Sequence, residues 1–348
     1  MTTSLDLHQD KALRASAPTS TSGLTDRFGR VHHDLRVSVT DRCSLRCSYC
    51  MPETGVGWLS SDTVLTATEF VRLVGIACTL GIQRVRLTGG EPLMRPDLVD
   101  IVDGISHLPQ PPALALTTNG IGLASRAAGL ARVGLNRINV SLDSIDPDVY
   151  RRITRRDRLD QVLAGLSAAK AAGLWPIKLN AVLQRGVNDE EASTLLDFAV
   201  QYGFELRFIE QMPLDGGHAW DQQTMVRESE ILARLSSSHQ LTPVAERGHS
   251  PARRWLVDGG PATVGVIAAV SQPFCAGCDR VRLTADGQLR NCLFSLREHD
   301  LRTAMREGAS DDDLAKLFIQ CVAAKGPGHS IGQVGFRQPA RPMSAIGG

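Results

Sequence analysis

The chain has 348 residues, of which 43% are hydrophobic and 22% are charged, and its formal net charge is +1. This length fits one barrel or α/β domain with an appendage, and the balanced charge does not indicate a surface that coats nucleic acid. No apolar run is long enough for a transmembrane helix, and the N-terminus lacks the order of a secretory signal. We therefore expect a cytoplasmic protein with no nucleic-acid or membrane partner. In that compartment clustered cysteines bind metal or perform chemistry rather than form disulfides.

Residues 1–24 are rich in Ser, Thr, Ala and Leu without periodicity, which predicts a disordered N-terminal extension. Residues 25–244 then alternate short β-rich runs with helical patterns that end at Gly. The expected strands cover residues 36–40, 84–88, 113–118, 136–141, 176–183 and 205–212. Thr66 and Glu69 have capping-box spacing at the start of the helix between the first two strands. Six such units predict a parallel sheet.

A doubly wound sheet and a partial barrel both fit this alternation, and polar residues favour one of them. Thr88, Thr117, Ser141 and Met212 fall at the C-terminal ends of expected strands, where α/β folds bind ligands. No G-x-G-x-x-G sequence opens the first unit, which weakens a dinucleotide-binding interpretation. We therefore predict an α/β protein with a partial (βα)6 TIM-type barrel. Frequent Gly, Pro and short strands over residues 245–348 predict a smaller C-terminal α+β domain that closes the barrel mouth.

The first cysteine cluster, CSLRCSYC, places Cys43, Cys47 and Cys50 at C-x3-C-x2-C spacing just after the first strand. A zinc site that borrows a distant fourth ligand is one interpretation of this spacing. The other is a [4Fe-4S] cluster held by three thiolates. Iron–sulfur clusters usually take four cysteines, so three would leave one iron open for a ligand from outside the chain.

With an aromatic residue before the third Cys, this cluster resembles the signature of the radical S-adenosylmethionine (SAM) superfamily. In that superfamily the open iron chelates the methionine part of SAM, and reductive cleavage gives a 5′-deoxyadenosyl radical. LTGGEPLMR (87–95) lies where the superfamily binds the SAM amino group, although alone it is better explained as a turn. Within this stretch, Glu91 would either accept a hydrogen bond from the SAM ammonium group or shape the loop. The resemblance implies SAM contacts by Tyr49, Gly90, Ser141 and Met212; for Met212 alone, core packing is the better explanation.

A second set of cysteines, Cys275, Cys278 and Cys292, has C-x2-C-x13-C spacing. Taken alone, this set also fits a zinc ribbon whose fourth ligand would be His299. Two incomplete sites in one chain are more informative than either. They suggest two [4Fe-4S] clusters, each with an open iron, that face each other across the barrel mouth.

Residues 26–348, with FCAGCDRVRLTADGQLRNCLF and the terminal Gly-Gly, closely resemble the GTP 3′,8-cyclase family of molybdenum-cofactor biosynthesis. The resemblance implies GTP as substrate, guanine on the open iron of the second cluster, and a new bond between C3′ and C8. It also implies an external electron donor and a cyclic pyranopterin monophosphate synthase that acts on the product. The oligomeric state does not follow from the sequence, and a homodimer is one possibility. A triphosphate calls for guanidinium groups. The residues expected around GTP are Arg36, Arg86, Thr117, Lys178, Arg280 and Arg282.

By the same resemblance, Gly347 and Gly348 insert into the active site and are needed for turnover, whereas most chain ends are frayed. Two rival interpretations remain. Another twin-cluster radical SAM enzyme would modify a peptide or protein, although Arg280, Arg282 and the terminal Gly-Gly argue against it. A zinc-stabilised binding module would be colourless and contain no iron. Two further cysteines, Cys78 and Cys321, lie in helical patterns and are expected to be small buried hydrophobic residues.

Overall fold

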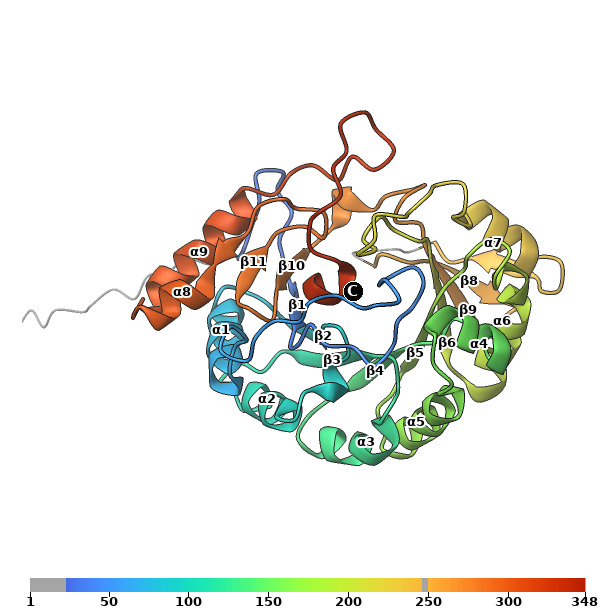
Figure 1. Ribbon diagram of the computed structural model, residues 1–348, viewed down its shortest axis with the longest axis horizontal. Coiled ribbons are helices and arrows are strands. Elements are labelled where there is room, and N and C mark those ends of the chain that lie inside the picture. Colours follow the sequence, from blue (N-terminus) through green and yellow to red (C-terminus); the bar gives the residue numbers. More distant parts are fainter. Residues whose placement is uncertain (1–22, 246–249, 348) are drawn as a thin grey trace, which may run out of the picture.

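The computed structural model describes residues 23–245 and 250–347, so most of the predicted extension lies outside the described residues. A single twelve-stranded sheet runs in the order β12-β11-β10-β1-β2-β3-β4-β5-β6-β9-β8-β7. Figure 1 looks along the resulting barrel, with strands around the interior and helices on the outside. Among the described residues, no helix has the length and apolar character needed to cross a membrane.

The first six strands form the predicted parallel core of the barrel. They are β1 (Asp34–Ser38), β2 (Arg84–Thr88), β3 (Ala113–Thr118), β4 (Arg137–Ser141), β5 (Ile177–Val182) and β6 (Glu205–Ile209). The helices that cover them are α1 (Ala67–Thr79), α2 (Leu98–Ser106), α3 (Leu123–Arg132), α4 (Pro147–Thr154), α5 (Leu159–Ala171) and α6 (Ala192–Tyr202). The capping box that begins α1 is present, because Thr66 Oγ1 accepts from the Glu69 amide at 3.2 Å and Glu69 accepts from the Thr66 amide at 2.8 Å.

β1 and β6 differ from the prediction by two or more residues, whereas the ends of β4 and β5 differ by at most one. β1 begins and ends two residues earlier than expected, a shift that keeps the side of the sheet on which each residue lies. β6 ends at Ile209 rather than at Met212, and the next residue, Glu210, has a buried side chain. The Glu210 amide still donates to the Ile267 carbonyl of β9 at 3.2 Å, and its buried carboxylate accepts from the amides of Val270 and Ser271 at 2.9 and 2.8 Å, so the chain turns here toward the loop after β9.

Strands from the C-terminal part of the chain continue the barrel sheet at both edges. β9 (Thr263–Ile267) pairs with β6 and β10 (Arg280–Leu283) pairs with β1, both in parallel. Four further strands add in antiparallel fashion: β7 (Leu241–Pro243), β8 (Arg253–Val257), β11 (Gln288–Arg290) and β12 (His299–Asp300). This part also forms α7 (Glu228–Leu235), α8 (Leu301–Arg306), α9 (Asp311–Ala323) and α10 (Met343–Ile346). The C-terminal region therefore has no separate sheet, and a domain boundary at residue 244 stays a prediction.

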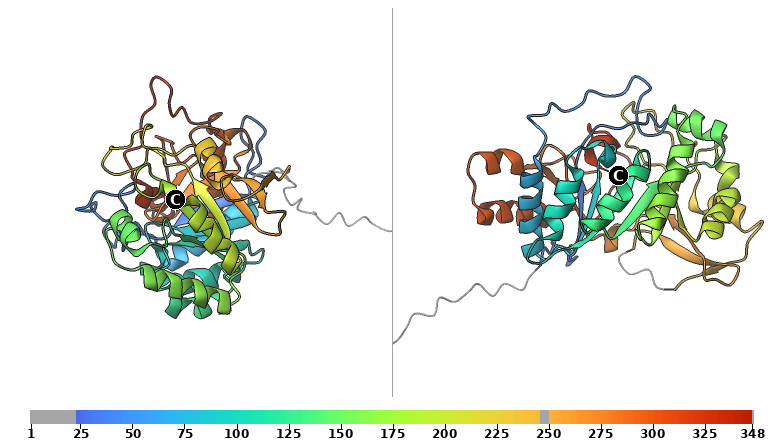
Figure 2. Two further views of the ribbon diagram at one scale, coloured as in Figure 1. Left: turned by 90° about the vertical axis from the view of Figure 1, so that its right-hand side faces the viewer. Right: turned by 90° about the horizontal axis from the view of Figure 1, so that it is seen from below.

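Alternation along the strands separates the core from the barrel interior. Leu35, Val37, Val85 and Leu87 point outward and are at most 1% exposed, in a hydrophobic core shared with the surrounding helices. Their neighbours in sequence, such as Arg36, therefore point into the barrel. Cys78 and Cys321 belong to the same buried core, as predicted. The sheet thus leaves an interior lined by polar residues, and Figure 2 shows the segment around α10 over that interior.

Candidate active site

The first cysteine cluster lies on the loop between β1 and α1, at the C-terminal edge of the barrel. The amides of Cys50 and Met51 donate to the Cys47 carbonyl at 2.9 and 3.0 Å, which folds the loop into a tight turn. The amides of Arg46 and Ser48 donate to carbonyls at the end of α4, at 3.0 and 2.9 Å. The loop is therefore fixed to the barrel on the side opposite its own helix.

The Gly-Gly pair of LTGGEP packs directly against this loop. A Cβ atom at Gly89 would lie 2.2 Å from the Thr40 carbonyl oxygen, and Gly89 has a φ of +142°. A Cβ atom at Gly90 would lie 2.4 Å from the carbonyl oxygen of Arg42. The Gly90 amide donates to the Thr40 carbonyl at 2.8 Å. Both glycines are thus required where the two loops meet backbone to backbone.

Glu91 shapes this loop from a buried position. Its carboxylate accepts from the Leu93 amide at 2.9 Å, the Thr118 hydroxyl at 2.6 Å and the Asn119 amide at 2.6 Å. Burial raises the pKa of Glu91 to about 7, although all three hydrogen bonds favour the charged form. Of the two expected roles, the structure supports the loop-shaping one, because the carboxylate oxygens already have protein donors.

One cavity of about 220 Å³ brings together every residue expected around SAM. Its lining includes Cys43, Cys47, Tyr49, Cys50, Gly90, Ser141 and Met212. The Tyr49 hydroxyl donates to Asp143 at 2.8 Å, and Asp143 also accepts from the Val182 amide at 2.8 Å. Asp143 therefore holds the Tyr49 ring in place, a role that sequence reasoning missed.

The chemistry of the three thiols fits a cationic cluster. Burial raises the pKa of Cys43 to about 11 and that of Cys50 to about 12, since a lone buried thiolate is costly. Thiolates at these positions therefore need a bound cation. In the described part of the chain, no three His, Cys, Asp or Glu side chains are grouped tightly enough for a single metal ion. Thiolates that bind different irons of one cluster need not converge on one point.

The second cysteine set flanks the hairpin of β10 and β11. Cys275, Cys278 and Cys292 line one small cavity of about 60 Å³ with Arg280, Arg282 and Met212. The buried Lys325 ammonium lies 3.5 Å from Cys278 Sγ and donates to the Arg280 carbonyl at 2.8 Å. Burial acts to raise the pKa of Cys278, but Lys325 and Arg280 outweigh it and lower the pKa. This environment stabilises a thiolate.

A second, larger cavity of about 460 Å³ contains every residue expected around GTP. Arg36, Arg86, Thr117, Lys178, Arg280 and Arg282 all line it. Sequence reasoning missed three further arginines in the lining, Arg84, Arg137 and Arg207. Eight Arg and Lys side chains thus face two carboxylates, Asp34 and Asp279, in the described lining. Such an excess of cations favours a polyanion.

Strand register arranges these cations in layers. Arg36 pairs with Arg282 of β10 on one side and with Arg86 of β2 on the other, which gives a row of three guanidinium groups. Two residues earlier on β1, Asp34 lies between Arg280 and Arg84. Because parallel register fixes both rows, the charges do not depend on flexible loops.

The carboxylates of the described chain satisfy these cations only in part. Arg36 Nε donates to Asp34 at 2.8 Å, and Lys178 lies 2.8 Å from Glu205. The buried Nε atoms of Arg86 and Arg280 have no hydrogen-bond partner in the described structure. Burial, followed by repulsion from neighbouring arginines, lowers the pKa of Arg282 to about 9. A bound anion would relieve both the desolvation and the repulsion.

The last described residues reach into the barrel mouth, where Figure 1 shows α10 inside the ring of strands. Ser38 Oγ donates to the Ile346 carbonyl at 2.8 Å, and Arg282 Nη1 donates to the Gly347 carbonyl at 2.5 Å. Gly347 has a φ of +86°, and a Cβ atom there would lie 2.2 Å from Ser38 Oγ. Only Gly fits this position. Gly348, the other expected tail residue, lies outside the described residues.

Two of the arginines that sequence reasoning missed could have been found from the alternation of side chains along their strands. Arg84 is two residues before Arg86 on β2, and Arg207 is the middle residue of β6. Both have the same inward parity as Arg36. Asp143 carried no such signal, because it follows β4 and its partner Tyr49 is distant in sequence.

Comparison with known proteins agrees with this geometry. Residues 37–199 match the profile of the Radical SAM superfamily, and residues 204–331 match that of Molybdenum Cofactor Synthesis C. The GTP 3′,8-cyclase of Streptomyces coelicolor is 55% identical over 328 residues, with 93% of this chain and 96% of the relative covered. The GTP 3′,8-cyclase 2 of Mycobacterium tuberculosis H37Rv is 53% identical over 335 residues, with 94% and 93% covered.

Among solved structures, Streptococcus suis SuiB bound to S-adenosylmethionine matches with a TM-score of 0.56 at 14% sequence identity. The match covers 77% of this chain and 62% of SuiB, less than two thirds of that protein. At this identity the likeness concerns the fold alone. The partial barrel thus has the fold of a radical SAM protein. Within that superfamily, the chain belongs to the GTP 3′,8-cyclase family.

Proposed function

We propose that this protein is a radical SAM lyase that converts GTP to (8S)-3′,8-cyclo-7,8-dihydroguanosine 5′-triphosphate in the first step of molybdenum-cofactor biosynthesis. The observation that carries the proposal is the arrangement of two adjoining cavities. One is lined by the first three cysteines and the other by eight cations, and both include Thr117, Asn180 and Met212 in their linings. A ligand at the cysteines would therefore lie next to a ligand held by the arginines.

In the smaller cavity, Cys43, Cys47 and Cys50 would hold a [4Fe-4S] cluster, and the loop around Gly90 would hold SAM. When bound and reduced, these groups supply a 5′-deoxyadenosyl radical that removes hydrogen from a substrate. The chain contributes orientation and exclusion of water. Asp143 fixes Tyr49, and Glu91 fixes the Gly-Gly turn by accepting from the loop after β3. Such fixed geometry is what positions a radical precursor near one ribose carbon.

In the larger cavity, the row of Arg282, Arg36 and Arg86 would bind the triphosphate, with Arg280 and Lys178 beside it. The second cysteine set would hold a second [4Fe-4S] cluster whose open iron takes the guanine ring. Support comes from Arg280 and Arg282, which line the cysteine cavity as well as the substrate cavity. Base and phosphates would then be held from neighbouring points of one strand, so that C3′ and C8 stay close.

Turnover would also require an external electron donor for the first cluster, and a cyclic pyranopterin monophosphate synthase would consume the product. A homodimer is compatible with this proposal. Gly347 and Gly348 would close the active site over the substrate. Support comes from the docked position of Gly347, which contacts Arg282 of the substrate cavity.

The direct test is anaerobic incubation of the reconstituted protein with GTP, SAM and a reductant. We expect 5′-deoxyadenosine and a cyclised nucleotide in equal amounts, with about eight iron atoms per chain. Formation of 5′-deoxyadenosine without any change in GTP would exclude the cyclase and favour a peptide-modifying radical SAM enzyme. A colourless protein with zinc and no iron would instead support the binding-module interpretation.

A further inference from the structure

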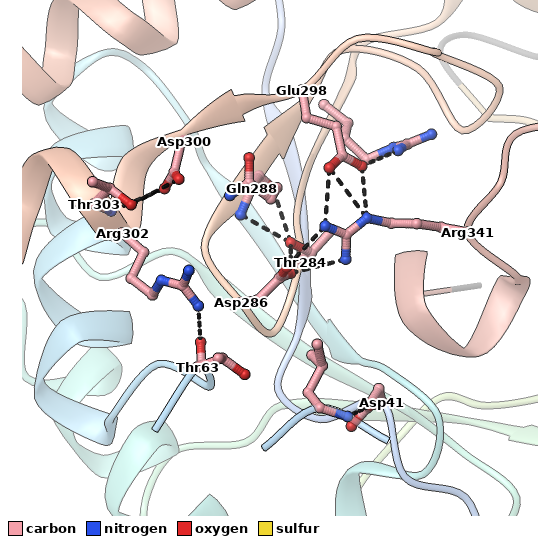
Figure 3. A network of polar contacts seen from close by, with 12 residues as sticks. Asp41, Thr63, Thr284, Asp286, Gln288, Glu298, Asp300, Arg302, Thr303 and Arg341 are labelled. Carbon is pink, nitrogen blue, oxygen red and sulfur yellow. Dashed lines mark hydrogen bonds and ion pairs between the residues drawn. The ribbon is translucent and has the colours of Figure 1, made fainter. Parts of the chain in front are cut away.

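Arg341 lies at the base of the tail segment (residues 342–347), the part of the chain that enters the barrel mouth. Its guanidinium is held between two carboxylates from another part of the chain, as Figure 3 shows. Arg341 Nη1 and Nη2 donate to Asp286 Oδ1 and Oδ2 at 3.1 and 2.8 Å. Arg341 Nε and Nη2 donate to Glu298 Oε2 at 3.1 and 2.9 Å. Both carboxylates are thus bound through two donors each.

The two carboxylates belong to the part of the chain that surrounds the second cysteine set. Asp286 lies in the turn between β10 and β11, where Thr284 Oγ1 donates to it at 2.6 Å. Glu298 precedes β12 and is also paired with Arg290 of β11. Since β10 carries Arg280 and Arg282, this turn is rigidly connected to the substrate cavity. A contact with Asp286 therefore fixes the tail relative to the arginine row.

This contact differs from an ordinary surface ion pair. The side chains of Arg341, Asp286 and Glu298 are 25%, 11% and 22% exposed, so water screens them only in part. Burial acts to raise the pKa of Asp286, but the hydrogen bonds from Arg341 and Thr284 lower it. With Arg290, the group has two positive and two negative charges. Forked arginine–carboxylate contacts are the geometrically specific kind.

The described tail segment contacts the barrel mouth through single hydrogen bonds and through Ile346, whose side chain is fully buried. The Met343 amide donates to the Leu214 carbonyl at 2.9 Å, Ser38 donates to Ile346, and Arg282 donates to Gly347. The first two are neutral hydrogen bonds of ordinary strength, whereas the bond from the Arg282 guanidinium has a charged donor. The forked contact of Arg341, directly before this segment, adds an attachment in which both partners are charged.

We propose that Asp286 and Glu298 form a docking site for Arg341, and that this site holds the tail segment in the barrel mouth. Arg341, Asp286 and Glu298 are positioning residues, because they act through Gly347 rather than on substrate. The consequence for turnover rests on the proposed function of the tail, whereas docking itself does not.

The test measures docking and turnover separately in the cluster-loaded enzyme. Hydrogen exchange of the Ala345, Ile346 and Gly347 amides reports docking, since all three donate within this segment. Arg341→Gln should speed their exchange ~10-fold or more, with iron content and thermal midpoint unchanged. Asp286→Asn with Glu298→Gln should speed the same exchange from the other side, with a lower thermal midpoint because it also removes the ion pair of the buried Arg290. Arg341→Lys should restore part of the protection. Arg337→Gln, at an exposed arginine four residues upstream, is the matched control.

The outcomes separate the two claims. Unchanged protection of the three amides in Arg341→Gln and in the double variant would overturn the docking site. Faster exchange with unchanged turnover of GTP would support the docking site and overturn the proposed function of the tail. Faster exchange with a lower kcat, an unchanged KM for GTP and retained protection in Arg337→Gln would support both.

Discussion

Replacement of Gly347 by Ala is the sharpest test of the tail geometry. The residue has a φ of +86°, and the added Cβ would lie 2.2 Å from Ser38 Oγ and 2.8 Å from Thr88 Cγ2. The left-handed backbone costs Ala about 1–2 kcal/mol. Moving Ser38 away breaks its hydrogen bond to Ile346, which is worth about 1 kcal/mol. The docking equilibrium constant should therefore fall about 30- to 150-fold, because each 1.36 kcal/mol is a factor of ten.

The assay is the initial rate of cyclised nucleotide formation at saturating SAM, with iron content matched between variants. Since Gly335 has a φ of +90° and open space around its Cβ position, Gly335→Ala controls for the backbone cost alone. Ser38→Ala removes the nearest clashing atom, so the double variant should be no slower than Gly347→Ala. A Gly347→Ala enzyme that works at the wild-type rate would refute the assigned role of Gly347.

Three further predictions concern the clusters, the substrate cavity and a buried histidine. Cys43→Ser and Cys292→Ser should each lower the iron content from about eight to about four atoms per chain, and only Cys43→Ser should abolish SAM cleavage. Because Arg86 Nε is buried without a partner, Arg86→Met should raise the thermal midpoint of the ligand-free protein by an amount equivalent to about 1 kcal/mol and weaken the stabilisation by GTP. Burial, followed by the charge of Lys325, lowers the pKa of His32 from 6.5 to about 4, so stability that is full above pH 6.5 is lost as the pH falls toward 4. His32→Gln should make the thermal midpoint depend less on pH over that range. The same pH dependence in this variant and in the wild type would contradict the reasoning.

The fold could be predicted because its signals are local. β2 and β3 have the predicted boundaries, since alternating strands lie between helices that end at Gly. The end of β6 could not be predicted, because the Glu210 carboxylate there accepts from amides some sixty residues later. In the same way, no local pattern showed that β9 and β10 would extend the parallel sheet at its two edges.

The candidate site could likewise be predicted only where the sequence signal is local. The residues expected around GTP gather in one cavity because strand parity decides which side chains face inward, whereas most of those expected around SAM lie on loops that follow strands. Register is not encoded locally, so the neighbours of Arg36 across the sheet had to come from the structure. The Arg341 site was equally hidden, since Asp286 and Glu298 lie 55 and 43 positions away.

The arginine row links the tail to the substrate through one side chain. Arg282 uses Nη1 for the Gly347 carbonyl, and a guanidinium has five N–H donors in all. Arg282 therefore retains donors for a phosphate while it holds the tail. A triphosphate on the row and the Gly347 carbonyl would each immobilise the same Arg282 side chain, so the group that binds second loses less side-chain freedom. Substrate binding and tail docking should consequently favour each other, and GTP should slow hydrogen exchange of the Gly347 amide.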